Sequence, residues 1–121
     1  MRVSGSCYCG ANRFTVDFAP EDAVECNCTY CSRMGALWAY YTPEQFKAEP
    51  TGSDRIYAPN GYNQHHFCAI CGCQTFGTAP DWQLDGKTDF SKVKVGVNIR
   101  LLEGFDIGAV RVTKMDGRNL W

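Results

Sequence analysis

The chain has 121 residues, the usual size of one domain, and a chain of this length can bury a core without disulfide staples. Twelve lysine and arginine residues against thirteen acidic ones leave a formal net charge of −1, which disfavours a surface built to follow phosphate backbones. No apolar run reaches the roughly 18–20 residues of a membrane span, and residues 1–7 lack the apolar stretch of a secretory signal. We therefore expect a single domain over residues 1–121 that binds neither nucleic acid nor a membrane.

Short strands are predicted along the whole chain. Residues 13–18 alternate between apolar and other types, with Phe14, Val16 and Phe18 on one side, as in a strand with one buried face. Six further short strands are predicted from apolar, aromatic and β-branched residues: 24–28, 36–41, 55–57, 65–67, 74–77 and 93–99. No stretch shows the 3.6-residue period of a long helix, so the fold class is mainly β.

Turn and cap residues separate these strands. Residues 42–45, Thr-Pro-Glu-Gln, have the cap residue, first-turn proline and reciprocal glutamine of a capping box, which predicts one or two helical turns. A loop-rich stretch follows over 48–61, and Asn60-Gly61 at its end predicts a hairpin. The dipeptides at 85–86 and 116–117, both Asp-Gly, predict further turns.

Eight cysteines are the unusual feature of the composition. They form three tight clusters: Cys7 and Cys9; Cys26, Cys28 and Cys31; and Cys68, Cys71 and Cys73. A disulfide between residues two or three apart is strained, so a disulfide framework would have to connect the clusters. Zinc binds each sulfur at about 2.3 Å, and neighbouring residues of a strand or a turn can bring their sulfurs to one ion. The clustering therefore favours metal ligation.

Spacing alone leaves two types of metal site open, zinc and an iron–sulfur cluster. All-thiolate iron–sulfur clusters also use four cysteines. Pairs of the form Cys-x-Cys are more typical of zinc knuckles than of ferredoxin-like runs, so zinc is the metal that we favour.

The eight thiols can divide as four plus four, or as four plus three with one to spare. One local set lies within six residues and could reach an ion without help: Cys26, Cys28 and Cys31. Such a set suits an open site, because a catalytic zinc keeps one position for water or substrate. The other set would form a closed structural site: Cys7, Cys9, Cys68 and Cys71. Cys73 either completes the second site or stays free as a small buried hydrophobe, and spacing alone favours neither.

The cysteine motifs also resemble those of a known family. In chain order they are Ser6-Cys7-Tyr8-Cys9-Gly10, Cys26-Asn27-Cys28-Thr29-Tyr30-Cys31-Ser32-Arg33 and Phe67-Cys68-Ala69-Ile70-Cys71-Gly72. They resemble the glutathione-dependent formaldehyde-activating enzyme family, which includes centromere protein V. Residues 97–118 are similar to the family's C-terminal segment, so the resemblance spans nearly the whole chain. The sequence departs from the family's usual residues at Tyr8, Cys73 and Met115.

The resemblance implies a fold of coiled, mostly antiparallel sheets with two zinc ions. It assigns Cys7, Cys9, Cys68 and Cys71 to a structural zinc site, and Cys26, Cys28 and Cys31 to a catalytic one. It implies a carbon–sulfur lyase type of activity, in which glutathione and formaldehyde condense to S-hydroxymethylglutathione. The expected partners are thus a small thiol and an aldehyde, and the sequence leaves the oligomeric state open. Reduced thiols and the missing signal indicate the cytoplasm.

A mechanism follows from three-thiolate coordination. Three thiolates on Zn²⁺ leave a net charge of 2 − 3 = −1, which makes the ion a weak Lewis acid toward an aldehyde oxygen. We therefore favour delivery of the substrate thiol as thiolate, because the metal lowers the thiol's pKa.

A few residues near the second cysteine cluster are candidates for a substrate pocket. Because glutathione carries two carboxylates and an amine, cations near the second cluster are candidates: Arg33, with Arg100 and Arg118 behind it. Trp38, Tyr40 and Tyr41 could wall a pocket, although an aromatic strand is more often core. His65 and His66 alternate faces on a predicted strand and are not expected to be ligands.

The main alternative is a zinc module without catalytic activity. Both sites would then be structural, and a loop or edge strand would bind a protein partner.

Overall fold

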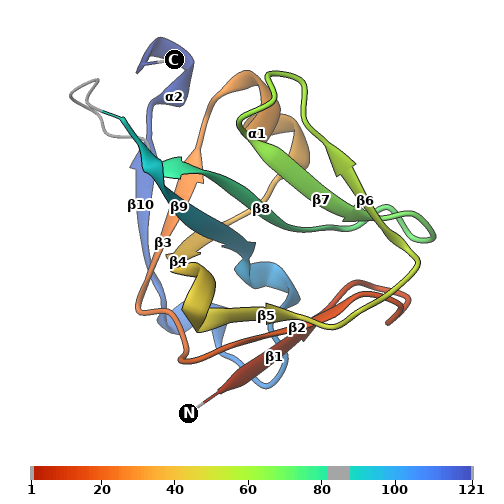
Figure 1. The fold of residues 1–121 in the computed structure, drawn as a ribbon. Helices are drawn as coiled ribbons and strands as arrows, with labels where there is room; N and C mark the ends of the chain where they lie inside the picture. Colours follow the sequence, from red (N-terminus) through yellow and green to blue (C-terminus); the bar gives the residue numbers. More distant parts are fainter. Residues whose placement is uncertain (1, 82–87, 121) are drawn as a thin grey trace.

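The computed structural model describes residues 2–81 and 88–120. These residues form two β-sheets with a few short helices (Figure 1), which confirms the mainly β class. The turn predicted at residues 85–86 lies outside the described residues. No helix of the described part is long and apolar enough to cross a membrane.

The smaller sheet has three antiparallel strands in the order β1-β2-β5: β1 (Val3–Ser6), β2 (Arg13–Val16) and β5 (Phe46–Ala48). It lies at the bottom of Figure 1, below the larger sheet. Phe14 and Val16 of β2 are buried, as the alternation predicts. Phe18 is 45% exposed, because β2 ends at Val16 and the expected third inward position lies beyond the strand.

The larger sheet has seven strands in the order β10-β3-β4-β9-β8-β7-β6. Their bounds are β3 (Asp22–Cys26), β4 (Trp38–Tyr41), β6 (Asp54–Tyr57), β7 (Gln64–Cys68), β8 (Gln74–Asp81), β9 (Asp89–Asn98) and β10 (Arg111–Met115). Its strand pairs are antiparallel except β10 with β3, which run parallel from Arg111 beside Asp22 to Met115 beside Cys26. The partners Asp22 and Arg111 are 89 positions apart in the sequence, so this pair joins two distant parts of the chain.

The core lies where inward-facing residues of both sheets meet. Its buried members are Phe14, Val16, Ala23, Leu37, Ala39, Tyr41, Val95, Val97, Ile99, Leu102 and Val110. A bridge between Gly5 and Leu102 connects β1 to the segment after β9. Phe46 of β5 packs its ring on Phe14 and on Phe76 of β8, with centroids 5.7 and 4.6 Å apart. The core therefore ties the small sheet to the large one.

Helical elements are short. They are the 3₁₀ turns η1 (Pro43–Gln45), η2 (Ile99–Leu101) and η3 (Ile107–Ala109), and the α-helices α1 (Thr29–Met34) and α2 (Gly117–Leu120). The capping box before η1 is confirmed, with Gln45 Oε1 accepting from the N–H of Thr42 at 3.0 Å.

The hairpin predicted at Asn60-Gly61 is confirmed. It connects β6 to β7, with Gly61 at φ 78°. Asn60 Oδ1 accepts hydrogen bonds from the N–H groups of Tyr62 and Asn63, which fixes the turn.

Two sequence predictions fail near the second cysteine cluster. The strand predicted over 24–28 ends at Cys26, because Cys28 instead caps the unpredicted helix α1. The turn predicted at 116–117 is the start of the one-turn helix α2.

Candidate metal centres and the adjoining pocket

Four sulfur atoms meet where the loop after β1 lies beside the end of β7 and the turn that follows it. They belong to Cys7, Cys9, Cys68 and Cys71, and all lie within 4.8 Å of one another. The sulfur of Cys9 lies 3.7 Å from those of Cys7 and Cys68. A tetrahedral zinc with bonds of about 2.3 Å places its sulfurs about 3.8 Å apart. This group, called here the first cysteine group, could hold a metal ion.

Backbone N–H groups surround these sulfurs. Asn12 N–H donates to Cys7 Sγ at 3.3 Å, and Ile70 N–H donates to Cys68 Sγ at 3.4 Å. The backbone N–H groups of Cys73 and Cys9 lower the pKa of the Cys71 thiol to about 6. Donors of this kind stabilise thiolates, which is the form that binds a metal.

Cys73 lies beside the first group and is not one of its four members. Its thiol is close to Cys71 and to the backbone N–H of Tyr8, and burial raises its pKa. The turn that carries it is closed by Cys68 N–H, which donates to the Cys73 carbonyl at 2.9 Å. Cys73 therefore does not supply a sulfur to the other group.

A second cysteine group forms where β3 passes into α1. Within the described part of the chain it has three sulfurs, of Cys26, Cys28 and Cys31, all within 4.8 Å of one another. Cys28 is the N-cap of α1, and its sulfur accepts from Cys31 N–H at 3.3 Å. Cys28 N–H in turn donates to Cys26 Sγ at 3.5 Å. The cap bends the chain so that all three sulfurs face one point.

Burial and nearby donors have opposite effects on these thiols. Burial raises the pKa of Cys26 and of Cys31. The backbone N–H of Gly117 acts to lower the pKa of Cys26, and the Trp38 side chain acts to lower that of Cys31, but burial outweighs both. Burial also acts to raise the pKa of Cys28, but the N–H groups of Cys31 and Tyr30 outweigh it and the net shift is downward.

A pocket of about 440 Å³ adjoins the second group, within the roughly 300–1,000 Å³ of small-molecule sites. It is lined by Glu25, Cys26, Asn27, Cys31, Ser32, Gly35, Ala36, Arg100, Lys114, Met115 and Asp116. Two of the three sulfur-bearing residues thus face a space large enough for a small molecule.

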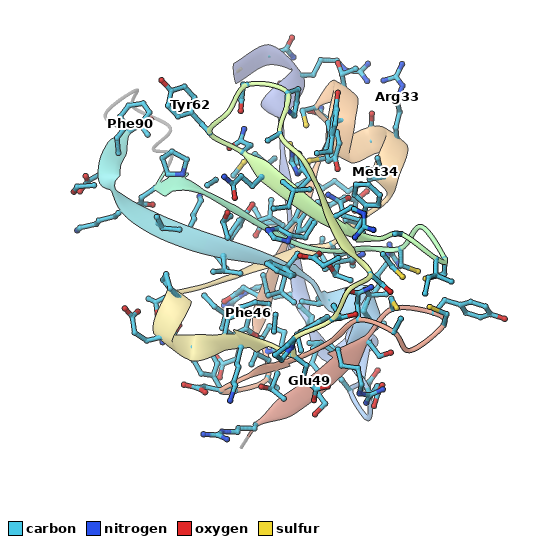
Figure 2. All side chains as sticks on the ribbon, turned by 45° about the vertical axis from the view of Figure 1, so that its right-hand side comes forward. Arg33, Met34, Phe46, Glu49, Tyr62 and Phe90 are labelled. Carbon is cyan, nitrogen blue, oxygen red and sulfur yellow. The ribbon has the colours of Figure 1, made fainter. Side chains whose placement is uncertain are left out.

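The three arginines proposed from the sequence have different positions. Arg100 lines the pocket, and its Nε donates to the carbonyl of Gly35 at 2.9 Å. Arg33 projects outward from α1 (Figure 2) and donates to the carbonyl of Thr29 at 2.9 Å. Arg118 is exposed and is not among the residues lining this pocket.

The aromatic residues after the second cysteine group are mainly structural. Trp38 and Tyr41 are buried, and Tyr41 Oη donates to the Phe18 carbonyl at 3.0 Å. Tyr40 is partly exposed, carries Lys94 Nζ 4.4 Å from its ring centroid, and has its pKa raised to about 12 by burial. The three residues line a separate surface pocket rather than the one beside the cysteines.

The two histidines make contacts other than metal ligation. His66 Nδ1 lies 2.8 Å from Asp54 Oδ2, and its ring stacks on Phe76 at a centroid distance of 4.1 Å. His65 stacks on Tyr30 of α1 at 4.0 Å. Neither is a member of a metal-binding group among the described residues.

Sequence reasoning missed the contribution of the C-terminal segment to this region. Met115 and Asp116 line the pocket, and Gly117 reaches Cys26, because β10 pairs with β3. The Asp-Gly dipeptide at 116–117 was the available signal, but it does not identify the strand that lies beside it.

The fold and its cysteines define a small β protein with two groups of thiols that could each hold a metal ion. A model of one family, the glutathione-dependent formaldehyde-activating enzymes, matches residues 2–99, and the chain belongs to this family. The structure is also similar to the crystal structure of a Rhodobacter sphaeroides protein, with 26% sequence identity and a TM-score of 0.70. That match covers 91% of this chain and 99% of the other.

Proposed function

We propose that the protein is a zinc-dependent enzyme of the carbon–sulfur lyase type. It joins a thiol such as glutathione to an aldehyde such as formaldehyde, giving S-hydroxymethylglutathione, and catalyses the reverse cleavage. The observation that carries this proposal is the three-sulfur group, which borders a pocket while a separate four-sulfur group lies beyond it. Family membership supports glutathione and formaldehyde as the reactants.

The two groups have different roles in this proposal. The first would hold a structural zinc through Cys7, Cys9, Cys68 and Cys71, and the second would hold a catalytic zinc through Cys26, Cys28 and Cys31. Zinc bound by three protein sulfurs supplies an open position that stabilises a substrate thiol as its thiolate.

The chain's own residues prepare this chemistry. The backbone N–H groups of Cys28 and Cys31 donate to the sulfurs of Cys26 and Cys28 and stabilise negative charge there, and the N-cap geometry holds the ligands in place before substrate arrives. The pocket orients the substrate so that its sulfur meets the aldehyde carbon. One carbon–sulfur bond forms, and the proton that leaves the thiol is balanced by the proton that the aldehyde oxygen takes up.

The test is the exchange between formaldehyde and glutathione, followed by two-dimensional exchange NMR. Wild-type protein loaded with zinc should accelerate the exchange, and Cys28→Ser should lose the acceleration, because the second group then has two sulfurs. Cys73→Ser is the matched control and should keep the wild-type rate, since Cys73 lies outside both groups. Equal exchange rates with and without wild-type protein would contradict the proposal and leave a zinc module without catalytic activity.

We expect the protein in the cytoplasm, where a reducing environment keeps eight thiols available for metal.

A further inference from the structure

Arg100 is a cation with a fixed position at the wall of the pocket. Asn98 Oδ1 accepts from its backbone N–H at 3.3 Å, and the adjacent Ile99 is buried and donates its N–H to Leu37 at 3.0 Å. The Nε of Arg100 donates to the carbonyl of Gly35, the C-cap of α1. The guanidinium is therefore held beside the helix that carries the second cysteine group.

The rest of this guanidinium is available to a ligand. Nε is the side-chain nitrogen that has a hydrogen bond within the described residues, and no described carboxylate lies within 4.0 Å of the group. An arginine with two free parallel N–H donors matches the geometry of a carboxylate, which it can bind through two hydrogen bonds.

The other charges of the pocket wall have partners or neighbours of opposite sign. The Asp116 carboxylate accepts from the side-chain amides of Asn27 and Asn119 at 3.0 and 2.8 Å. Lys114 is the Cα partner of Glu25 in the register of β10 and β3, and no described carboxylate lies within 4.0 Å of its ammonium group. Arg100 differs from Lys114 in the described wall because a hydrogen bond to the Gly35 carbonyl holds its guanidinium beside α1.

The negative charge expected at the second cysteine group suggests a role for the Arg100 guanidinium. A zinc with three thiolates carries a net −1 and repels an anionic thiol. A positive group that faces the same pocket offsets this repulsion and fixes the distance between the substrate's carboxylate and its sulfur.

We propose that Arg100 is a specificity-determining residue of the reaction proposed above, on which this inference rests. Its free N–H groups bind a carboxylate of the substrate thiol, and the protein therefore selects thiols that carry a carboxylate over neutral thiols.

The experiment uses the zinc-loaded full chain and three thiols with formaldehyde. Glutathione and 3-mercaptopropionate carry a carboxylate, and 2-mercaptoethanol does not. Arg100→Gln should raise KM for the two acidic thiols by about 10- to 100-fold, the value of a charge-assisted hydrogen-bonded pair, with kcat within about threefold. KM for 2-mercaptoethanol should stay within about twofold.

Two controls separate recognition from structural damage. Arg33→Gln removes an equal charge that points away from the pocket and should leave all three KM values unchanged. Arg100→Lys keeps the charge without the planar fork and should raise KM for the acidic thiols by less than Arg100→Gln does. An equal loss of activity with acidic and neutral thiols in Arg100→Gln would overturn the inference, because it would show damage to α1 through the lost bond to Gly35.

Binding measured by calorimetry distinguishes this inference from the proposed function. One outcome is a wild type that binds glutathione without accelerating exchange, while Arg100→Gln binds glutathione more weakly than the wild type. That result would contradict the proposed lyase activity and support the role of Arg100 in binding. Unchanged glutathione affinity in Arg100→Gln, or no glutathione binding by the wild type, would overturn the inference.

Discussion

At the scale of single residues, the contact between Gly5 and Phe14 shows how tightly the small sheet is packed. The two residues are partners in the β1–β2 pair, and the Phe14 ring lies over the Gly5 backbone. A Cβ added at Gly5 would lie 2.4 Å from the ring, closer than two carbon atoms can approach. Phe14 is 2% exposed, so its ring has no free space into which it could move.

Gly5→Ala should therefore lower the free energy of unfolding by about 1–3 kcal/mol, the usual cost of overpacking a core. Urea denaturation of the zinc-loaded protein measures it. Gly52→Ala is the matched control, because a Cβ there meets nothing within 4 Å and the residue does not need a positive φ. Equal stability of the Gly5 and Gly52 variants would show that the Phe14 ring can shift.

At the scale of elements, α1 is a helix whose position is not stabilised by buried side chains of its own. It has six residues and none of them is buried, and a helix this short is not stable alone. Tyr30 connects it to the large sheet: its ring stacks on His65, and Gln74 Nε2 donates to its hydroxyl at 2.6 Å. Burial, followed by the charge of Cys31, raises the pKa of Tyr30 to about 12, so the hydroxyl stays protonated at neutral pH.

Tyr30→Ala should release α1 from the sheet while leaving the rest of the fold in place. The amides of Ser32 and Gly35, which donate to the carbonyls of Cys28 and Cys31, should exchange with solvent at least about tenfold faster. The amide of Val97 in the core should keep its wild-type rate. Arg33→Ala serves as the control on the same helix, and faster exchange in that variant too would contradict the role given to Tyr30.

The same helix marks the limit of what the sequence could predict. Alternation identified β2, and a capping box identified η1, because both signals are local. α1 carries no apolar period and has no buried residue, so the sequence predicts a strand over 24–28 and no helix after it. Cysteine spacing permits a division of the sulfurs into four and three, and the family resemblance selects it, but the position of Cys73 depends on the turn after β7.

At the scale of the whole molecule, the first cysteine group joins the two sheets. Cys7 and Cys9 follow β1 of the small sheet, whereas Cys68 ends β7 of the large sheet and Cys71 lies in the turn after it. A structural zinc contributes on the order of 10 kcal/mol to folding, comparable to the whole stability of a domain. The second group, in contrast, joins one strand to the helix that directly follows it.

Removing one sulfur from each group should therefore have unequal effects. Cys9→Ser and Cys28→Ser should each lower zinc content from two ions per chain to one. Only Cys9→Ser should abolish cooperative thermal unfolding near the wild-type midpoint, because the two sheets lose their metal link. Metal analysis with calorimetry checks both, and equal thermal stability of the two variants would contradict the division into structural and catalytic groups.

The parallel pairing of β10 with β3 has a consequence for the order of assembly. The three sulfurs of the second group are within six residues and can gather around an ion as soon as that stretch is made, whereas Arg111–Met115 must return across 89 residues to reach Asp22–Cys26. Closing so long a loop is slow compared with a local contact. If the second group holds a metal ion as proposed, a newly made chain can therefore gather the three sulfurs around it before Lys114, Met115 and Asp116 complete the pocket wall.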